Sequence, residues 1–333
     1  MTKTTMTEPD VATKAPESDA QENPTIPGDT PAQSGPTMGE HCTTDRPTPA
    51  GEAPKGEIRK LGGVDIYLAK PDEYPSNPSK LLLLLTGGTG LKSTNNQIQA
   101  DKFAEEGYVV VMPDLFEGDP APNAGATVPE PESQSSFLDM FKLKAAETAK
   151  SFLIDMWLAR HTEEKVWPIL QKVIHAAEGE FADAIGNGGG IYAVGYCFGG
   201  RYVLLLAAER PVAAQSGWTG AQKPADEESG EQAKKGPYIK AGARAHATLV
   251  SPDDFQGLKA PVSLVCVEND PLFPDEVRMA GEDIMSKENL EHEVQVYPGV
   301  PHGFGVFGDY DDPNIKEAQA TAFAQMLDWI EEH

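Results

Sequence analysis

The stretch that decides the fold is Ile191-Tyr-Ala-Val-Gly-Tyr-Cys-Phe-Gly-Gly200. Its first six residues form an apolar run without polar alternation, which is typical of a strand buried on both faces of a parallel sheet. An apolar helical pattern follows from Gly199 to Ala208. Strand, sharp turn and helix in this order predict an α/β architecture with a thiol, Cys197, at the turn.

The sequence on both sides repeats this alternation. Short apolar runs predict further strands at residues 81–85, 108–112, 261–267 and 294–297. A hairpin around Gly62-Gly63 is expected before them. Apolar positions three to four residues apart predict helices at 97–106, 138–156, 166–181 and 275–287, and a last helix opens at Asp312-Pro313. We therefore predict a mostly parallel central sheet with helices on both faces and a ligand site at the carboxyl ends of its strands.

Composition excludes several classes of function. The chain has 333 residues, a net charge of −25 and a mean hydropathy of −0.40. Such acidity repels a phosphate backbone, so we expect no nucleic-acid partner. The hydropathy and the absence of an N-terminal apolar run predict a cytoplasmic protein without a membrane partner. Three scattered cysteines make neither a disulfide framework nor a zinc site, so no metal is expected.

Residues 1–56 are predicted to form a disordered, acidic tail rich in Pro and Thr. They carry nine acidic and four basic residues, and no aromatic residue precedes Tyr67. Such a segment buries too little apolar surface to offset the entropy of ordering it. A single domain is predicted for residues 57–333, with a polar surface insertion near residues 222–235.

The turn after the central strand has the spacing of a nucleophile elbow, with cysteine in the serine position. In Gly195-Tyr-Cys-Phe-Gly199, glycines two residues before and after the thiol let the chain turn without collision. The start of the following helix favours a thiolate there. A small buried cysteine in a strand–helix turn is the alternative interpretation of Cys197.

Two residues further along the chain favour the catalytic interpretation. Asp270 follows one predicted strand and His302 follows the next. Nucleophile, acid and histidine in this order are typical of α/β hydrolases. An imidazole beside Cys197 can take its proton, while Asp270 fixes the tautomer. We therefore predict an α/β-hydrolase fold with Cys197, Asp270 and His302 as a catalytic triad.

With these motifs together, the sequence resembles the dienelactone hydrolase family, and especially its fungal branch. The resemblance spans about residues 57–333 and is carried by residues 195–200, 268–274, 297–304 and 106–115. It implies a Cys-His-Asp hydrolase that needs no cofactor. Its small-molecule substrate would be a lactone, such as carboxymethylenebutenolide opened to a maleylacetate-like product, or a small ester.

Three departures from the bacterial members bear on the substrate. Those members place a glutamate just after the strand that here ends at Leu85, where this chain has Thr86-Gly87-Gly88. They also grip a substrate carboxylate with two arginines, and this chain has Glu117-Gly118-Asp119 and Val306 at those positions. A carboxylesterase or thioesterase acting on a neutral ester is therefore one alternative. A non-catalytic binding protein with the same fold is another.

The remaining site residues are predicted from their positions. Backbone N–H groups of Phe198 and about Gly88 are expected to stabilise an oxyanion. Trp218, His246 and Phe304 are expected to contact the substrate, although a loop histidine without a role is the alternative for His246. The glycine-rich loop after residue 85 does not match a phosphate-binding loop, because Leu91 separates the glycine from the lysine. The sequence leaves the oligomeric state open.

Overall fold

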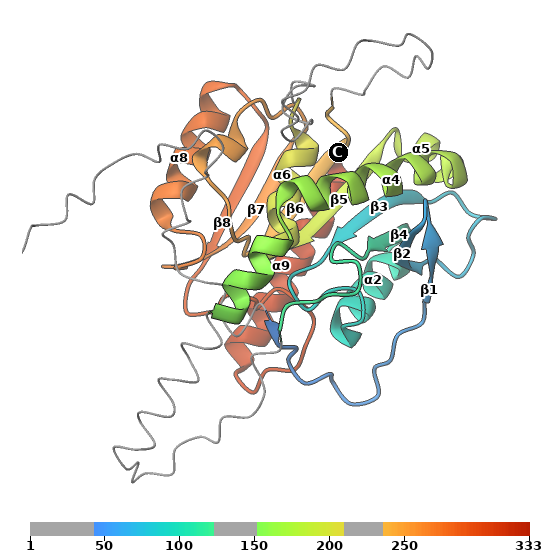
Figure 1. The fold of residues 1–333 in the computed structure, drawn as a ribbon, viewed down its shortest axis with the longest axis horizontal. Coiled ribbons are helices and arrows are strands. Elements are labelled where there is room, and N and C mark those ends of the chain that lie inside the picture. Colours follow the sequence, from blue (N-terminus) through green and yellow to red (C-terminus); the bar gives the residue numbers. More distant parts are fainter. Residues whose placement is uncertain (1–42, 123–151, 210–235) are drawn as a thin grey trace, which may run out of the picture. The chain divides into compact units, whose positions relative to one another are not determined.

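The computed structural model describes residues 43–122, 152–209 and 236–333. Within these ranges one 8-stranded sheet has the order β1-β2-β4-β3-β5-β6-β7-β8 (Figure 1). The strands are β1 (Glu57–Leu61), β2 (Val64–Ala69), β3 (Lys80–Leu85), β4 (Tyr108–Pro113), β5 (Ile191–Tyr196), β6 (Ala241–Ala245), β7 (Val262–Val267) and β8 (His292–Tyr297). β2 is antiparallel to β1 and β4, and the pairs from β4 to β8 are parallel. The predicted mostly parallel sheet is confirmed.

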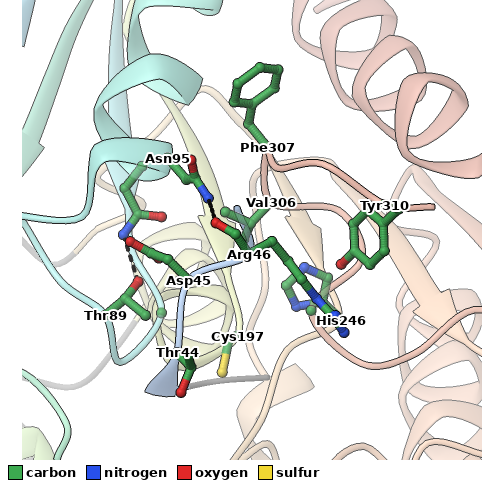
Figure 2. Close-up of a pocket in the computed structure, with 13 residues that line it drawn as sticks. Thr44, Asp45, Arg46, Thr89, Asn95, Cys197, His246, Val306, Phe307 and Tyr310 are labelled. Carbon is green, nitrogen blue, oxygen red and sulfur yellow. Dashed lines mark hydrogen bonds between the residues drawn. The ribbon is translucent and has the colours of Figure 1, made fainter. Parts of the chain in front are cut away.

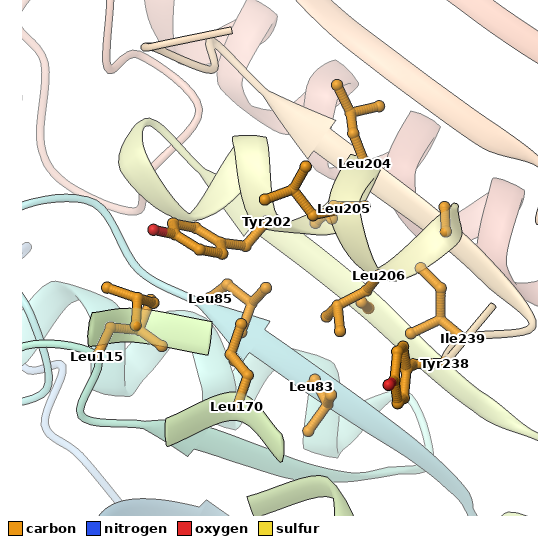
Figure 3. Packing of buried hydrophobic residues seen from close by; sticks show 14 of the residues in the cluster. Leu83, Leu85, Leu115, Leu170, Tyr202, Leu204, Leu205, Leu206, Tyr238 and Ile239 are labelled. Atoms are coloured by element: carbon orange, nitrogen blue, oxygen red, sulfur yellow. The ribbon is translucent and has the colours of Figure 1, made fainter. Parts of the chain in front are cut away.

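Helices cover both faces of this sheet. α2 (Thr94–Glu105) and α9 (Pro313–Glu332) pack on one face. The other face carries α4 (Glu163–Glu180), α5 (Ala182–Gly188), α6 (Phe198–Ala207), α8 (Asp275–Lys287) and the 3-10 turn η1 (Pro252–Phe255). Leu83 and Leu85 of β3 pack toward α4 and α6 (Figure 3), whereas Leu82 and Leu84 face α2 and α9. An unbroken leucine run is what a strand covered on both faces requires.

Local sequence signals correctly predict the first hairpin and the start of the last helix. The hairpin joins β1 to β2 through Gly62 and Gly63, whose φ angles of 59° and 82° are rarely adopted by residues with side chains. At the other end, the Asp312 carboxylate accepts a hydrogen bond of 2.8 Å from the Asn314 N–H and caps α9, which opens on Pro313. Both predicted elements are confirmed.

For one helical segment, the prediction of which face is buried is wrong. In the helical segment that begins at residue 152, Phe152 and Met156 are 62% and 46% exposed, although the pattern assigned them to the core. Ile154 and Trp157 face the core instead. Because apolar residues occur on every side of this segment, periodicity does not decide which face turns inward. Residues 138–151 of that predicted helix lie outside the described part.

The boundary expected at residue 56 is too late. Residues 43–48, which we call the strap, pack on the domain although their composition resembles that of the preceding residues. The Ser93 hydroxyl donates to the Asp45 carboxylate (2.8 Å), and the Asp309 N–H donates to the Pro47 carbonyl (2.8 Å). Polar partners hold this segment, and composition alone does not reveal such partners. Residues 1–42 and the predicted insertion at 222–235 lie outside the described ranges.

Candidate active site

Cys197 lies at the turn between β5 and α6, in a strained conformation. Its φ of 49° and ψ of −114° fall outside the usual regions for a residue with a side chain. The chain on either side approaches very closely: a Cβ atom on Gly195 would lie 2.6 Å from the Gly199 carbonyl oxygen. A Cβ atom on Gly199 would lie 2.2 Å from the Leu85 carbonyl oxygen. Both glycines are therefore required sterically, and the thiol is presented at the N-terminus of α6.

The carboxyl ends of β7 and β8 bring Asp270 and His302 together. His302 Nδ1 lies 2.7 Å from Asp270 Oδ2, and both side chains are buried. The carboxylate also accepts a hydrogen bond of 2.9 Å from the Leu272 N–H, which fixes its orientation. Since a carboxylate only accepts, Nδ1 carries the proton and donates it, and Nε2 remains for chemistry.

The electrostatics of His302 link it to the thiol. Burial alone lowers the pKa of the imidazole, but hydrogen bonds with Asp270 and Cys197 outweigh burial and raise the pKa to about 9. The protonated ring is therefore favoured at neutral pH. An imidazolium beside a thiol stabilises the thiolate, which is the nucleophilic form of cysteine.

Cys197 borders a cavity of about 30 Å³ (Figure 2). This volume corresponds to about one water molecule. The strap supplies one wall through residues 44–46, the start of α2 supplies Asn95 and Asn96, and the loop after β8 supplies residues from Gly303 to Tyr310. The cavity is therefore formed by segments far apart in the sequence, with the strap among them.

Of the expected substrate contacts that the structure describes, His246 lines this cavity and Phe304 does not. Its side chain is buried, and its ring centroid lies 5.1 Å from that of His302 in a steep edge arrangement. Its φ of 36° is in the left-handed region, where strain persists only if the surroundings impose it. A Cβ atom on Gly305 would approach His246 Nε2 to 3.2 Å. A tight glycine loop therefore holds a second imidazole beside the predicted triad.

Phe304, a second expected contact, lies away from the cavity. Phe304 is fully buried on the α2 and α9 side of the sheet, 5.2 Å from the Tyr297 ring and 6.1 Å from the His246 ring. It supports His246 within the core. Trp218 lies outside the described residues.

The loop after β3 approaches the thiol through Gly87 rather than Gly88. A Cβ atom on Gly87 would lie 3.1 Å from the Cys197 Cβ atom, and Gly87 lines the cavity. Gly88 accepts a hydrogen bond of 2.8 Å from the Ala121 N–H through its carbonyl. The Thr86 carbonyl accepts one of 3.0 Å from the Gly199 N–H, which ties this loop to α6. Gly87 is thus the residue of this loop best placed beside Phe198, the first residue of α6.

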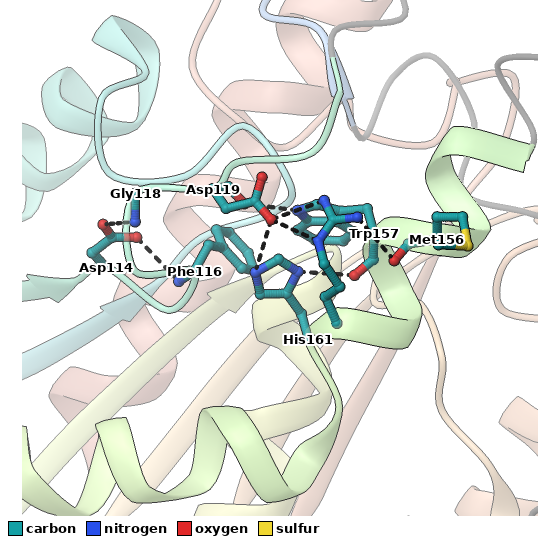
Figure 4. Close-up of polar contacts among 8 residues, drawn as sticks. Asp114, Phe116, Gly118, Asp119, Met156, Trp157 and His161 are labelled. Atoms are coloured by element: carbon teal, nitrogen blue, oxygen red, sulfur yellow. Dashed lines mark hydrogen bonds and ion pairs between the residues drawn. The ribbon is translucent and has the colours of Figure 1, made fainter.

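The loop after β4 is held by polar contacts with the helical segment that begins at residue 152 (Figure 4). The Asp119 carboxylate pairs with Arg160 at 2.9 Å, and the Asp119 carbonyl accepts a hydrogen bond of 2.8 Å from Trp157 Nε1. The Phe116 ring packs 4.9 Å from Trp157 and 5.2 Å from Phe198. The loop after β4 is therefore fixed by an ion pair and an aromatic cluster.

Two features of the site had no signal in the sequence. The strap brings Arg46 to the cavity, where its guanidinium lies 4.8 Å above the Tyr310 ring. The sequence predicts Gly88 in place of Gly87, because a glycine pair gives no indication of which member touches the thiol. In the described ranges, no three His, Cys, Asp or Glu side chains are grouped to hold a metal ion. No helix there is long and apolar enough to cross a bilayer.

The model of the dienelactone hydrolase family matches residues 64–333. This chain belongs to the dienelactone hydrolase family. It is accordingly a hydrolase that acts on ester bonds, and its small-molecule substrate is an ester in the broad sense that includes lactones.

Named relatives are distant but cover most of the chain. The hydrolase tropI of Talaromyces stipitatus is 28% identical over 284 residues, covering 84% of this chain and 91% of the relative. Dienlactone hydrolase 1 of Gibberella moniliformis is 29% identical over 278 residues, covering 84% and 88%.

Solved structures share the α/β-hydrolase fold of this family member. A Klebsiella pneumoniae protein superposes with a TM-score of 0.57 at 18% identity, covering 85% of this chain and 100% of the other. A propionate-bound esterase of Thermogutta terrifontis gives 0.53 at 16% identity, covering 83% and 94%. At these identities the likeness concerns the fold alone.

Proposed function

We propose that this member hydrolyses its ester or lactone by acyl transfer to Cys197, with His302 as the acid–base group and Asp270 as its orienting partner. The observation that carries the proposal is the 2.7 Å contact between His302 Nδ1 and Asp270 Oδ2, buried beside a thiol on a strained turn. Three groups from separate strand ends meet there, which is the arrangement that nucleophilic acyl transfer requires.

Acylation begins with attack of the Cys197 thiolate on the substrate carbonyl carbon. The carbonyl oxygen becomes an oxyanion, and we assign its stabilisation to the N–H groups of Phe198 and of Gly87, with Gly88 as the neighbouring alternative. When the intermediate collapses, the C–O bond to the leaving alkoxide breaks. His302 donates its Nε2 proton to that alkoxide, and a thioester on Cys197 remains.

Deacylation uses the same groups in reverse. Neutral His302 takes a proton from a water molecule, which attacks the thioester carbon. The second tetrahedral intermediate expels the Cys197 thiolate and releases the carboxylic acid. The imidazolium–thiolate pair is thereby restored, and Asp270 stabilises the ring charge in both halves of the reaction.

The nucleophile restricts the substrate class. A thiolate leaves a tetrahedral intermediate more readily than an amine does, so esters, lactones and thioesters suit this site better than amides. His246 lines the cavity beside Cys197, and we assign it to contact with the bound substrate. A neutral ester is the competing substrate class, and a binding protein without turnover is the competing function.

A panel of lactones, aryl esters and thioesters tests the proposal directly. The wild-type protein should hydrolyse members of the panel, and mass spectrometry of rapidly quenched mixtures should find the acyl group on the peptide that contains Cys197. Cys266 is the matched control, because it is the other buried thiol of the described residues and lies in β7. Turnover without acylation of Cys197 contradicts the mechanism. Binding without turnover of any ester favours the binding-protein alternative.

A further inference from the structure

Arg244 of β6 is a fully buried cation. Its side chain is 1% exposed, and its three guanidinium nitrogens have no hydrogen-bond partner among the described residues. Burial lowers the pKa of the guanidinium to about 10, with Cys266 and Asp254 partly opposing this effect, so Arg244 is still charged at neutral pH. An unpaired buried charge is destabilising, and a protein that keeps one generally does so where function requires it.

Arg201 of α6 shows the usual way of stabilising a cation inside a protein. It donates to both carboxylate oxygens of Asp254, at 3.0 and 2.9 Å, and to Glu163 at 3.0 Å. Asp254 also attracts Arg244 electrostatically, but its carboxylate is already paired with Arg201. Carboxylates therefore stabilise Arg201, whereas aromatic rings contact the guanidinium of Arg244.

These rings are Phe273 and Phe255. The guanidinium carbon of Arg244 lies 4.3 Å from the centroid of the Phe273 ring and 5.4 Å from that of the Phe255 ring. Both phenylalanines are buried. A cation–π contact is stronger where water is excluded, so the Phe273 ring, the nearer of the two, is held firmly by the Arg244 charge.

Phe273 belongs to the turn that orients the predicted acid. Its N–H donates to the Asp270 carbonyl (3.3 Å), and the Leu272 N–H donates to the Asp270 carboxylate (2.9 Å). The same carboxylate contacts His302 Nδ1 at 2.7 Å. The position of the Phe273 ring therefore fixes a turn whose backbone sets the direction of the Asp270 side chain.

The backbone around Arg244 contacts the elbow. Arg244 pairs with Gly195 of β5, two residues before the thiol. The next carbonyl, that of Ala245, accepts a hydrogen bond of 3.2 Å from the Cys197 N–H. A Cβ atom on Gly200 of α6 would lie 3.6 Å from the Arg244 Cβ atom. Arg244 thus borders the strand and helix that carry the thiol, and its guanidinium contacts the turn that carries the acid.

We infer that Arg244 is a positioning residue, whose guanidinium holds the Phe273 ring and thereby keeps Asp270 aligned with the elbow. This inference rests on the proposed function, since it takes Asp270 as the orienting partner of His302. Arg244 is not among the described residues that line the cavity, so it acts through the turn and not on the substrate. An apolar side chain at this position would pack against the ring without the attraction of a cation.

The test removes each side of the contact while keeping apolar bulk, with Arg244→Met and Phe273→Leu. Each should lower kcat for a hydrolysed ester of the panel about fivefold to thirtyfold, the range expected for a buried cation–π contact. The double variant should lose no more than either single variant, because both remove the same contact. Arg244→Lys keeps a cation and should retain part of kcat. Phe255→Leu is the matched control and should keep kcat, since that ring belongs to η1 and not to the acid turn.

Two further measurements distinguish positioning from a merely structural role. The melting temperature of Arg244→Met should equal or exceed that of wild type, because the variant removes an unpaired buried charge. The fall of kcat/KM at high pH should occur at lower pH in Arg244→Met and Phe273→Leu, because the Asp270 hydrogen bond that raises the pKa of His302 is weakened. Loss of the positive charge alone would move that fall to higher pH, since a cation disfavours the imidazolium.

Unchanged kcat and pH profiles in Arg244→Met and Phe273→Leu, additive losses in the double variant, or a fall at higher pH overturn the inference. An equal loss of kcat in Phe255→Leu does so as well. If Arg244→Met melts early, Phe273→Leu tests the contact with the charge in place. In all these cases acylation of Cys197 still supports the proposed function. If Asp270→Asn hydrolyses the panel as fast as wild type, the proposed triad and this inference fail together.

Discussion

Two regions border the cavity beside Cys197, and they are held in place by different forces. The residues of the proposed triad lie just after β5, β7 and β8, where strand pairing and glycine contacts fix the backbone. The strap is irregular chain held by side-chain and loop hydrogen bonds from Ser93, Asn95 and Asp309. The sheet therefore positions the proposed catalytic residues, whereas the strap, which lies outside the sheet, forms one wall of the cavity.

This difference has an energetic consequence. Opening the triad edge requires disruption of the central sheet, so its cost approaches that of global unfolding. Releasing the strap breaks a few hydrogen bonds, each contributing about 1 kcal/mol. Substitutions at the sheet edge should therefore abolish turnover, and substitutions at the strap should change substrate preference and affinity.

The largest effect is expected for Cys197→Ala. Removing the nucleophile should lower kcat by about 10⁵- to 10⁶-fold, because the remaining groups act as a unit with it. The melting temperature should change little, and steady-state ester hydrolysis measures the loss. Cys266→Ala should keep kcat while losing some stability, since it truncates a buried side chain. Wild-type turnover in Cys197→Ala would remove this thiol from the mechanism.

Asp270→Asn should lower kcat by about 10⁴-fold, because the imidazole loses its oriented tautomer.

The same substitution should change the pH profile. His302 is charged below its raised pKa of about 9, so the imidazolium–thiolate pair is present at neutral pH and disappears as the pH rises through about 9. In wild type, kcat/KM should therefore fall above that pH. In Asp270→Asn the fall should occur at lower pH, because the hydrogen bond that raises the pKa is gone.

The pH dependence of folding stability should also reflect the titration of His302. The pKa of His302 rises from 6.5 to about 9 on folding, so its contribution to stability is complete below pH 6.5 and is lost as the pH rises through about 9. Thermal melts of wild type and Asp270→Asn across this window measure the difference. Equal pH dependence in the two proteins would contradict the assigned partner.

Gly199→Ala tests how the sheet edge is built. A methyl group there would lie 2.2 Å from the Leu85 carbonyl oxygen, so α6 and the loop after β3 must move apart. We expect a loss of about 1–3 kcal/mol of stability and a lower kcat, because Gly87 moves away from Cys197. The control is Gly179→Ala in α4, where nothing lies within 4 Å and alanine should stabilise the helix by up to about 1 kcal/mol. Equal stabilities would mean that the close approach does not define the elbow.

The sequence predicted the sheet edge well and the strap not at all, for a physical reason. Strands, the elbow and the order of Cys197, Asp270 and His302 leave patterns within a few residues of one another or at strand ends. Among the described residues, Asn95 holds Arg46 and Asp309 holds Pro47, and both partners lie far away along the chain. Neither hydropathy nor composition records such long-range polar contacts.

The difference between local sequence patterns and long-range contacts also explains two smaller errors of the sequence-based predictions. Phe304 is predicted at the substrate from its place two residues after His302, but its ring is fully buried beside Tyr297 and does not line the cavity. The apolar face of the segment from residue 152 was misassigned because several faces were apolar. Where the pattern was unambiguous, as in α4, the predicted buried positions Val166, Leu170 and Val173 are confirmed.

The smallest effect is expected for Asn95→Ala, which loosens the strap without touching the triad. Asn95 donates to the Arg46 carbonyl (2.7 Å) and accepts from the Thr48 hydroxyl (2.8 Å), so the variant should lose about 1–2 kcal/mol of stability. Because Asn95 lines the cavity, KM for a hydrolysed ester of the panel should rise several-fold while kcat stays near wild type. Asn314→Ala, an exposed asparagine in α9 with bonds to Asp312, serves as the control and should change neither quantity. If Asn95→Ala lowered kcat as much as Asp270→Asn does, the strap and the sheet edge would form one unit, and specificity would not be separable from chemistry in this protein.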